Sequence, residues 1–191
     1  MSIQAVERIV PVSANRIEIV ADVPFERLRQ NFEREVPPLD EQLFARLVAE
    51  GADWKRFVQA SGGRGIHSFV AFWQHSPSPV MSAGGSDAPS AAYLIGDHAT
   101  TARMFRHDPG ILLYAPLRLE LHADSADRPD SADRPDSAGH AGRTVLSVDQ
   151  PSSQLVTFGN NKIAQAGYEL DRMLGDLLEE LGLPRPSVLR R

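Results

Sequence analysis

The segment Tyr93-Leu-Ile-Gly-Asp-His-Ala-Thr-Thr-Ala-Arg-Met-Phe-Arg-His-Asp-Pro-Gly-Ile-Leu-Leu-Tyr-Ala-Pro-Leu-Arg-Leu-Glu-Leu-His122 decides the fold. It begins as an apolar strand and continues into a short helix that Asp97 or Thr100 can cap. Asp108-Pro-Gly110 then predicts a turn, and residues 112–122 predict a long strand. The segment therefore indicates two strands joined through a short helix.

The long strand has two faces of different chemistry. Leu117, Leu119 and Leu121 point to one side, whereas the intervening charged residues point to the other, because successive side chains alternate along a strand. The leucine face should meet helices. The charged face, made of Arg118, Glu120 and His122, needs water, a second subunit or a ligand.

Other parts of the chain show readable periodicities. Alternation predicts a first strand at 16–20, and helical spacing predicts helices at 25–36, 39–48 and 54–58. Four more strands are predicted at 66–74, 91–95, 112–122 and 144–148, and one long amphipathic helix at 163–181. The order of strand, helices, four strands and helix predicts an α+β fold: a two-layer structure in which helices cover one face of an antiparallel sheet.

Composition supports a single domain over residues 1–191. With 42% hydrophobic residues, the chain can build one core, which we place at 15–181. Two flexible loop insertions are also predicted. The first, at about 76–90, is rich in Pro, Gly and Ser, and the second, at about 123–143, contains a repeated Asp-Ser-Ala-Asp-Arg-Pro.

Charge and cysteine content limit the partners and the compartment. The formal net charge of −5 argues against a nucleic-acid partner, which would require a basic face. The amino-terminal residues do not have the apolar core of a signal peptide, and no segment approaches the length of a membrane span. We therefore expect a cytoplasmic protein without a membrane partner. The absence of cysteine excludes disulfides and thiolate chemistry.

Four residues are candidates for a functional site. His75 lies where a strand passes into a loop, and its near-neutral pKa would suit a general acid or base, although it could equally pack at the strand end. Arg118 could bind a carboxylate or phosphate, or pair with Asp149 or Glu120 across the sheet. Asp149 could orient His75 or hold a turn, and Tyr114 could offer its hydroxyl to a pocket.

A second group, formed by His98, His107 and Asp108, is more easily explained by capping and turn formation. Its two histidines are nine residues apart, which is not the spacing that places two ligands on one helical face. We therefore assign no metal and no cofactor. A serine hydrolase and a phosphate-loop enzyme are also poor fits, because their glycine-framed motifs do not occur in the sequence.

Four short motifs, in order, resemble the bacterial and archaeal family known as domain of unknown function 302. They are Gln74-His75, Ile95-Gly-Asp-His98, Ala115-Pro-Leu-Arg118 and Ser147-Val-Asp-Gln-Pro-Ser152. The resemblance covers most of residues 15–181. It implies a fold like that of the TATA-binding protein and a homodimer, but it brings no established activity. The chain departs from the family pattern at Gln74, Asp97-His98 and Val148.

These observations lead to one main hypothesis and two alternatives. The main hypothesis is a domain that binds a partly apolar, anionic small molecule in a cleft between sheet and helices, near His75, Tyr114, Arg118 and Asp149. The first alternative is an enzyme that uses His75 as a general acid or base. The second is a dimeric structural or interaction protein, whose charged sheet face forms the interface and holds no small molecule.

Overall fold

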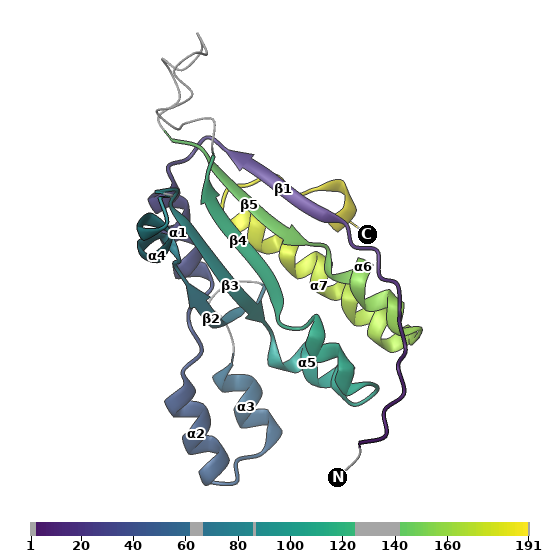
Figure 1. Ribbon diagram of the computed structural model, residues 1–191. Coiled ribbons are helices and arrows are strands. Elements are labelled where there is room, and N and C mark those ends of the chain that lie inside the picture. Colours follow the sequence, from purple (N-terminus) through teal and green to yellow (C-terminus); the bar gives the residue numbers. More distant parts are fainter. Residues whose placement is uncertain (1–2, 62–66, 86, 125–141, 191) are drawn as a thin grey trace.

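The computed structural model describes residues 3–61, 67–85, 87–124 and 142–190. Five strands form one antiparallel sheet in the order β1-β5-β4-β3-β2 (Figure 1). Their bounds are Arg16–Ala21 for β1, Val70–His75 for β2, Ser90–Gly96 for β3, Leu117–Ala123 for β4 and Thr144–Asp149 for β5. The predicted α+β class is thus confirmed.

Seven helices are found in the described part of the chain. They are α1 (Phe25–Glu35), α2 (Glu41–Ala49), α3 (Trp54–Ala60), α4 (Ser78–Ala83), α5 (His98–Phe105), α6 (Pro151–Leu155) and α7 (Asn161–Glu180). Figure 1 shows α1 and α7 on one face of the sheet, while α2 and α3 project from its lower end. Within the described residues, none of the helices has both the length and the apolar character that crossing a membrane demands.

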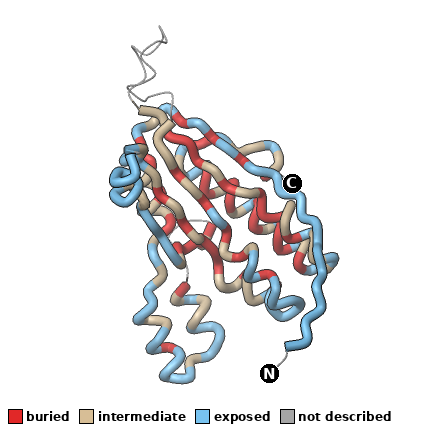
Figure 2. Tube along the Cα trace, in the orientation of Figure 1, coloured by how far each residue is buried: buried red, intermediate tan, exposed pale blue. Residues whose placement is uncertain are grey.

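The core lies between the sheet and the two covering helices. Strand β1 alternates exposed and buried residues, and the apolar stripe of α7 recurs every three or four residues, so each element presents one face to the core (Figure 2). The Asn160 side chain caps α7 by accepting bonds from the amides of Lys162 and Ile163. Buried Leu183 and Leu189 extend the core beyond the expected limit at residue 181.

A hydrogen-bond network joins β5 to α7. Asp171 is buried within α7, and its carboxylate accepts bonds from the backbone amide (2.9 Å) and the hydroxyl (2.6 Å) of Ser152. Gln150 donates a third bond of 2.8 Å to the same carboxylate. Because a buried carboxylate needs such partners, the network fixes the end of β5 against the helix layer.

Two sequence-based expectations differ from the structure. The strand expected at 112–122 begins only at Leu117, because Asp108 caps a 3-10 helix at Pro109–Leu113 through a 2.7 Å bond to the amide of Gly110. The loop expected at 76–90 contains α4, which prolines at its amino-terminal turn help to start. Most of the loop expected at 123–143 lies outside the described residues.

Candidate functional site

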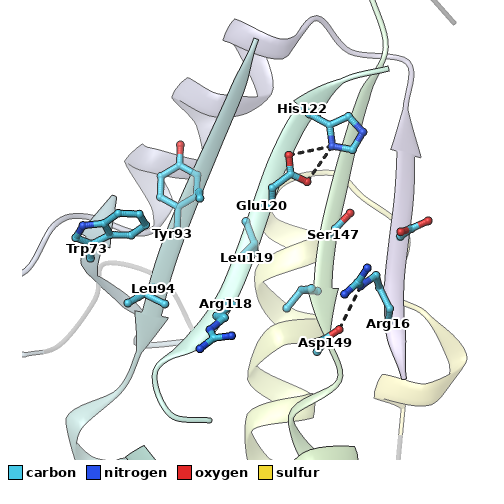
Figure 3. A pocket seen from close by; sticks show the side chains of 13 residues that line it. Arg16, Trp73, Tyr93, Leu94, Arg118, Leu119, Glu120, His122, Ser147 and Asp149 are labelled. Carbon is cyan, nitrogen blue, oxygen red and sulfur yellow. Dashed lines mark hydrogen bonds and ion pairs between the residues drawn. The ribbon is translucent and has the colours of Figure 1, made fainter. Parts of the chain in front are cut away.

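The face of the sheet opposite α1 and α7 carries no helix in the part of the chain that the structure describes (Figure 1), and Figure 3 shows side chains on this face. A groove of about 750 Å³ crosses all five strands on this face. Trp73 on β2 and Leu94 on β3 are apolar side chains at one end of the groove, and its charged side chains lie on β1, β4 and β5. The residues that line it are Arg16, Glu18, Trp73, Ala92, Tyr93, Leu94, Arg118, Leu119, Glu120, His122, Ser147, Val148 and Asp149.

A β-bulge brings the largest aromatic side chain to this groove. Ala71 pairs with Ile95, but Trp73 pairs with Leu94, so Phe72 is an extra residue in β2. The extra residue reverses the alternation, and Trp73 therefore faces the open side instead of the core. The Trp73 side chain remains 48% exposed, next to Leu94 on the adjacent strand.

Most of the charges in the groove already have partners. Arg16 pairs with Asp149 at 3.4 Å, and the Nδ1 atom of His122 lies 2.9 Å from both carboxylate oxygens of Glu120 (Figure 3). Arg118 is different: among the described residues, no hydrogen bond or ion pair to its guanidinium is found. The cross-strand pairing that we considered for Arg118 is therefore not formed, and its charge remains available on the open face.

The structure brings three of the four predicted site residues together. Arg118 and Asp149 line both the groove and an adjoining cavity of about 230 Å³, which Tyr114 and Gln154 also line. The Tyr114 ring packs against the core beside Phe158, but the groove itself lies on the open face of the sheet and not in the expected cleft under the helices. The reason is the alternation of β4, which directs Arg118 away from the leucines that pack on the helices.

His75 lies apart from the other three. Its ring stacks on Trp73, with 5.6 Å between the ring centroids, but it does not line the groove. It lines a separate cavity of about 200 Å³ at the sheet edge, together with Arg29, Glu33 and Tyr93. The pairing register accounts for the separation: Trp73 is level with Leu94 and Arg118, whereas His75 lies two residues further along, level with Ala92 and Glu120.

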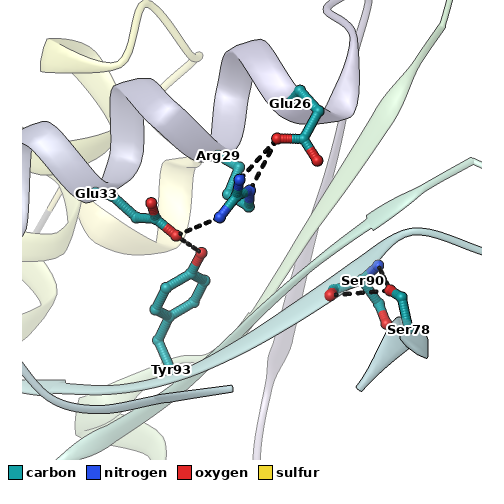
Figure 4. Close-up of polar contacts among 6 residues, drawn as sticks. All are labelled: Glu26, Arg29, Glu33, Ser78, Ser90 and Tyr93. Carbon is teal, nitrogen blue, oxygen red and sulfur yellow. Dashed lines mark hydrogen bonds and ion pairs between the residues drawn. The ribbon is translucent and has the colours of Figure 1, made fainter. Parts of the chain in front are cut away.

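The polar groups at this edge cavity already bind one another (Figure 4). The hydroxyl of Tyr93 donates a 3.0 Å bond to Glu33, and Arg29 pairs with the same carboxylate oxygen at 3.0 Å. Burial, and then the charge of Glu33, raises the pKa of Tyr93, so its hydroxyl stays protonated at neutral pH. If His75 moves protons, its neighbours are thus Tyr93 and Glu33, not Arg118 and Asp149.

The second sequence cluster is also separated in space. His98 packs between Phe44 and Phe72, with ring centroids 4.8 Å from each, and burial lowers its pKa. His107 lines a different surface cavity, and Asp108 caps the 3-10 helix. Across the described residues, no group of three or more His, Cys, Asp or Glu side chains could hold a metal ion.

Sequence reasoning found Arg118 and Asp149 but missed most of the groove lining. Alternation in the first strand could have identified Arg16 and Glu18 as outward-facing, since Ile17 and Ile19 are the inward residues. No comparable signal marks Trp73, because the position of the bulge depends on the pairing of β2 with β3.

Comparisons with known proteins define the class of fold. No protein-family model matches the sequence, and no curated protein matches it. Among solved structures, the chain is similar to the uncharacterized conserved protein DUF302 from Bacillus stearothermophilus, at 11% sequence identity and a TM-score of 0.55. The match covers 87% of this chain and 97% of that one. The chain therefore has a DUF302-like α+β fold, as the short motifs had suggested.

Proposed function

We propose that this protein binds a small, partly apolar, anionic molecule in the groove on the open sheet face. The observation that carries the proposal is the free guanidinium of Arg118 beside the apolar side chains of Leu94 and Trp73. An arginine fork suits a carboxylate or phosphate, and a groove of this size falls within the usual range for small-molecule sites.

The charges around Arg118 also limit what the ligand can be. Of the two arginines that line the groove, Arg16 is paired with Asp149, so Arg118 supplies a positive charge without a partner among the described residues. Glu18 and Glu120 line the same groove and would repel a second anionic group. These charges favour a ligand with one anionic group at one end and an apolar body that lies against Trp73.

A binding experiment with aromatic and short-chain carboxylates tests this proposal. Thermal-shift screening should find ligands whose affinity falls roughly 10- to 100-fold in Arg118→Ala, because a hydrogen bond to a charged group contributes about 1.5–3 kcal/mol. Trp73→Ala should also weaken binding through the lost apolar contact. Arg27→Ala is the matched control, since Arg27 is an exposed arginine on α1 outside the groove. Equal affinity in wild type, Arg118→Ala and Trp73→Ala would refute the assignment.

A homodimer interface on the same face is the second candidate function. It is supported by the exposed apolar side chains of Trp73 (48%) and Val20 (55%), which share this face with charges of both signs. Light scattering of the purified chain distinguishes the two functions. A dimer that Trp73→Glu and Val20→Glu convert to monomer favours an interface, whereas a wild-type monomer excludes it.

The enzyme alternative now concerns the edge cavity instead of the groove. We propose His75 as its proton-transfer group only together with Tyr93 and Glu33, which line the same cavity. A reaction whose rate is unchanged in His75→Ala would remove this alternative. We also propose a cytoplasmic location, which the cysteine-free sequence supports.

A further inference from the structure

A different cavity lies where the end of α5 meets the first turns of α7. Its volume is about 310 Å³, and it is lined by Arg103, Arg106, His107, Lys162, Gln165, Ala166 and Glu169. Four of these seven side chains are basic or can become so, in a chain whose formal net charge is −5. We propose that this cavity binds the phosphate group of a small molecule.

The charges in the cavity do not balance internally. Arg103 pairs with Glu169 and also donates a 3.3 Å bond to the hydroxyl of Thr100. Among the described residues, the side chains of Arg106 and Lys162 have no hydrogen bond or ion pair. After the Arg103–Glu169 pair is subtracted, the cavity therefore retains two permanent positive charges.

The helix termini explain part of this charge but not all of it. Arg103 and Arg106 lie at the carboxyl end of α5, where the helix dipole favours cations. Lys162 lies in the first turn of the 20-residue helix α7, where the dipole disfavours a cation. Lys162 thus faces an unfavourable dipole and like charges from α5. An anion bound between the two helices would offset both the unfavourable dipole of α7 and the repulsion from the α5 arginines.

The two helices that line the cavity are anchored in the core and to each other. Met104 of α5 and Ile163 of α7, each next to a lining residue in the sequence, are fully buried, and the Arg103–Glu169 pair links the two helices. Asn160 already caps the first amides of α7, so basic side chains, and not free backbone amides, would bind the anion. The small volume suits a phosphate on a short body, such as a phosphomonoester.

This site is independent of the sheet-face proposal. The groove there carries carboxylates that disfavour a doubly charged group, whereas this cavity has an excess of positive charge. Failure of either proposal leaves the other unaffected.

Calorimetric titration of the full chain at low salt tests the inference, with inorganic pyrophosphate and glycerol 3-phosphate as probes. Saturable binding should appear below about 10 mM and weaken at least ~10-fold in Lys162→Gln and in Arg106→Gln. Lys55→Gln is the matched control, because Lys55 is an exposed lysine on α3 away from this cavity. Preference for glycerol 3-phosphate over pyrophosphate would indicate that the organic body contributes to binding.

A stability measurement separates ligand binding from a structural role. Without anion, Lys162→Gln should raise the melting temperature by about 1–3 °C, since it removes a cation from an unfavourable helix end. With pyrophosphate present, wild type should gain more stability than the variant. The inference is overturned if neither probe binds, if Lys55→Gln weakens binding as much as Lys162→Gln, or if Lys162→Gln lowers the melting temperature without anion.

Discussion

Gly167 lies where α6 packs against α7, and replacing it by alanine tests how closely the two helices approach. A Cβ atom at this position would lie 3.0 Å from the Cα of Ser152 and 3.2 Å from the Cβ of Leu155. Carbon atoms in good contact are about 3.5–4.0 Å apart. Since one obstructing atom belongs to the backbone, α6 itself must move.

Two opposing effects determine how much Gly167→Ala changes the free energy of unfolding. Alanine in a helix interior is favoured over glycine by about 1 kcal/mol. Overpacking a dense interior costs about 1–3 kcal/mol, and a shift of Ser152 would also strain its bonds to Asp171. We expect the cost of the clash to exceed the gain in helix propensity, so that Gly167→Ala lowers the free energy of unfolding by about 1–2 kcal/mol.

Gly175→Ala in the same helix is the matched control. There the three atoms nearest to the new Cβ all belong to the guanidinium of Arg185, which can rotate away from its partners Asp176 and Glu179. Loosening these partly buried pairs costs about 1 kcal/mol, which offsets the gain in helix propensity, so the stability of Gly175→Ala should stay close to that of wild type. Urea denaturation followed by circular dichroism measures both variants. If Gly167→Ala equals or exceeds Gly175→Ala in stability, the reasoning about α6 is wrong.

Three further predictions concern buried polar groups. Asp171→Ala should lower the free energy of unfolding by about 3 kcal/mol or more, because two donors of Ser152 and one of Gln150 lose a buried carboxylate; a loss below about 1 kcal/mol in urea would contradict this. Burial lowers the pKa of His67 below its ordinary 6.5, so the unfolded chain takes up a proton first as pH falls. Stability should therefore decrease below that value, by at most about 1.4 kcal/mol per pH unit, and His67→Gln should flatten the curve. Tyr93→Phe should cost about 1–2 kcal/mol through the lost bond to the α1 carboxylate, whereas exposed Tyr168→Phe should be neutral in the same assay.

Periodic segments were predicted well because their signals are local. The stripe of α7 and the alternation of β4 each follow from one element meeting a single core, and both appear in the structure as expected. The 3-10 helix at Pro109–Leu113 was missed, since a side-chain cap there overrides an apolar run that resembles a strand. Helix α4 was missed for another reason: its sequence is rich in Ser and Pro, which is typical of a loop, and it has no side-chain cap.

The candidate site was only partly predictable. Arg118 could be placed on the charged face from sequence alone, but its lack of a partner could not, because Asp149 pairs with Arg16 only through the β1–β5 register. Likewise, His75 was grouped with Arg118 although the pairing register sets His75 level with Glu120, two residues further along the sheet.

The sequence by itself determined the α+β class, the order of the elements and the existence of a charged sheet face, because those depend on periodicity and composition. Tertiary structure decided which charges meet. Strand register set His75 level with Glu120 instead of Arg118, and the bulge in β2 turned Trp73 toward the groove. The packing of α5 against α7 brought the basic side chains of the second cavity together. The physical reason is that the spacing of hydrophobic residues is a local property of the sequence, whereas contacts between distant side chains depend on strand register and packing.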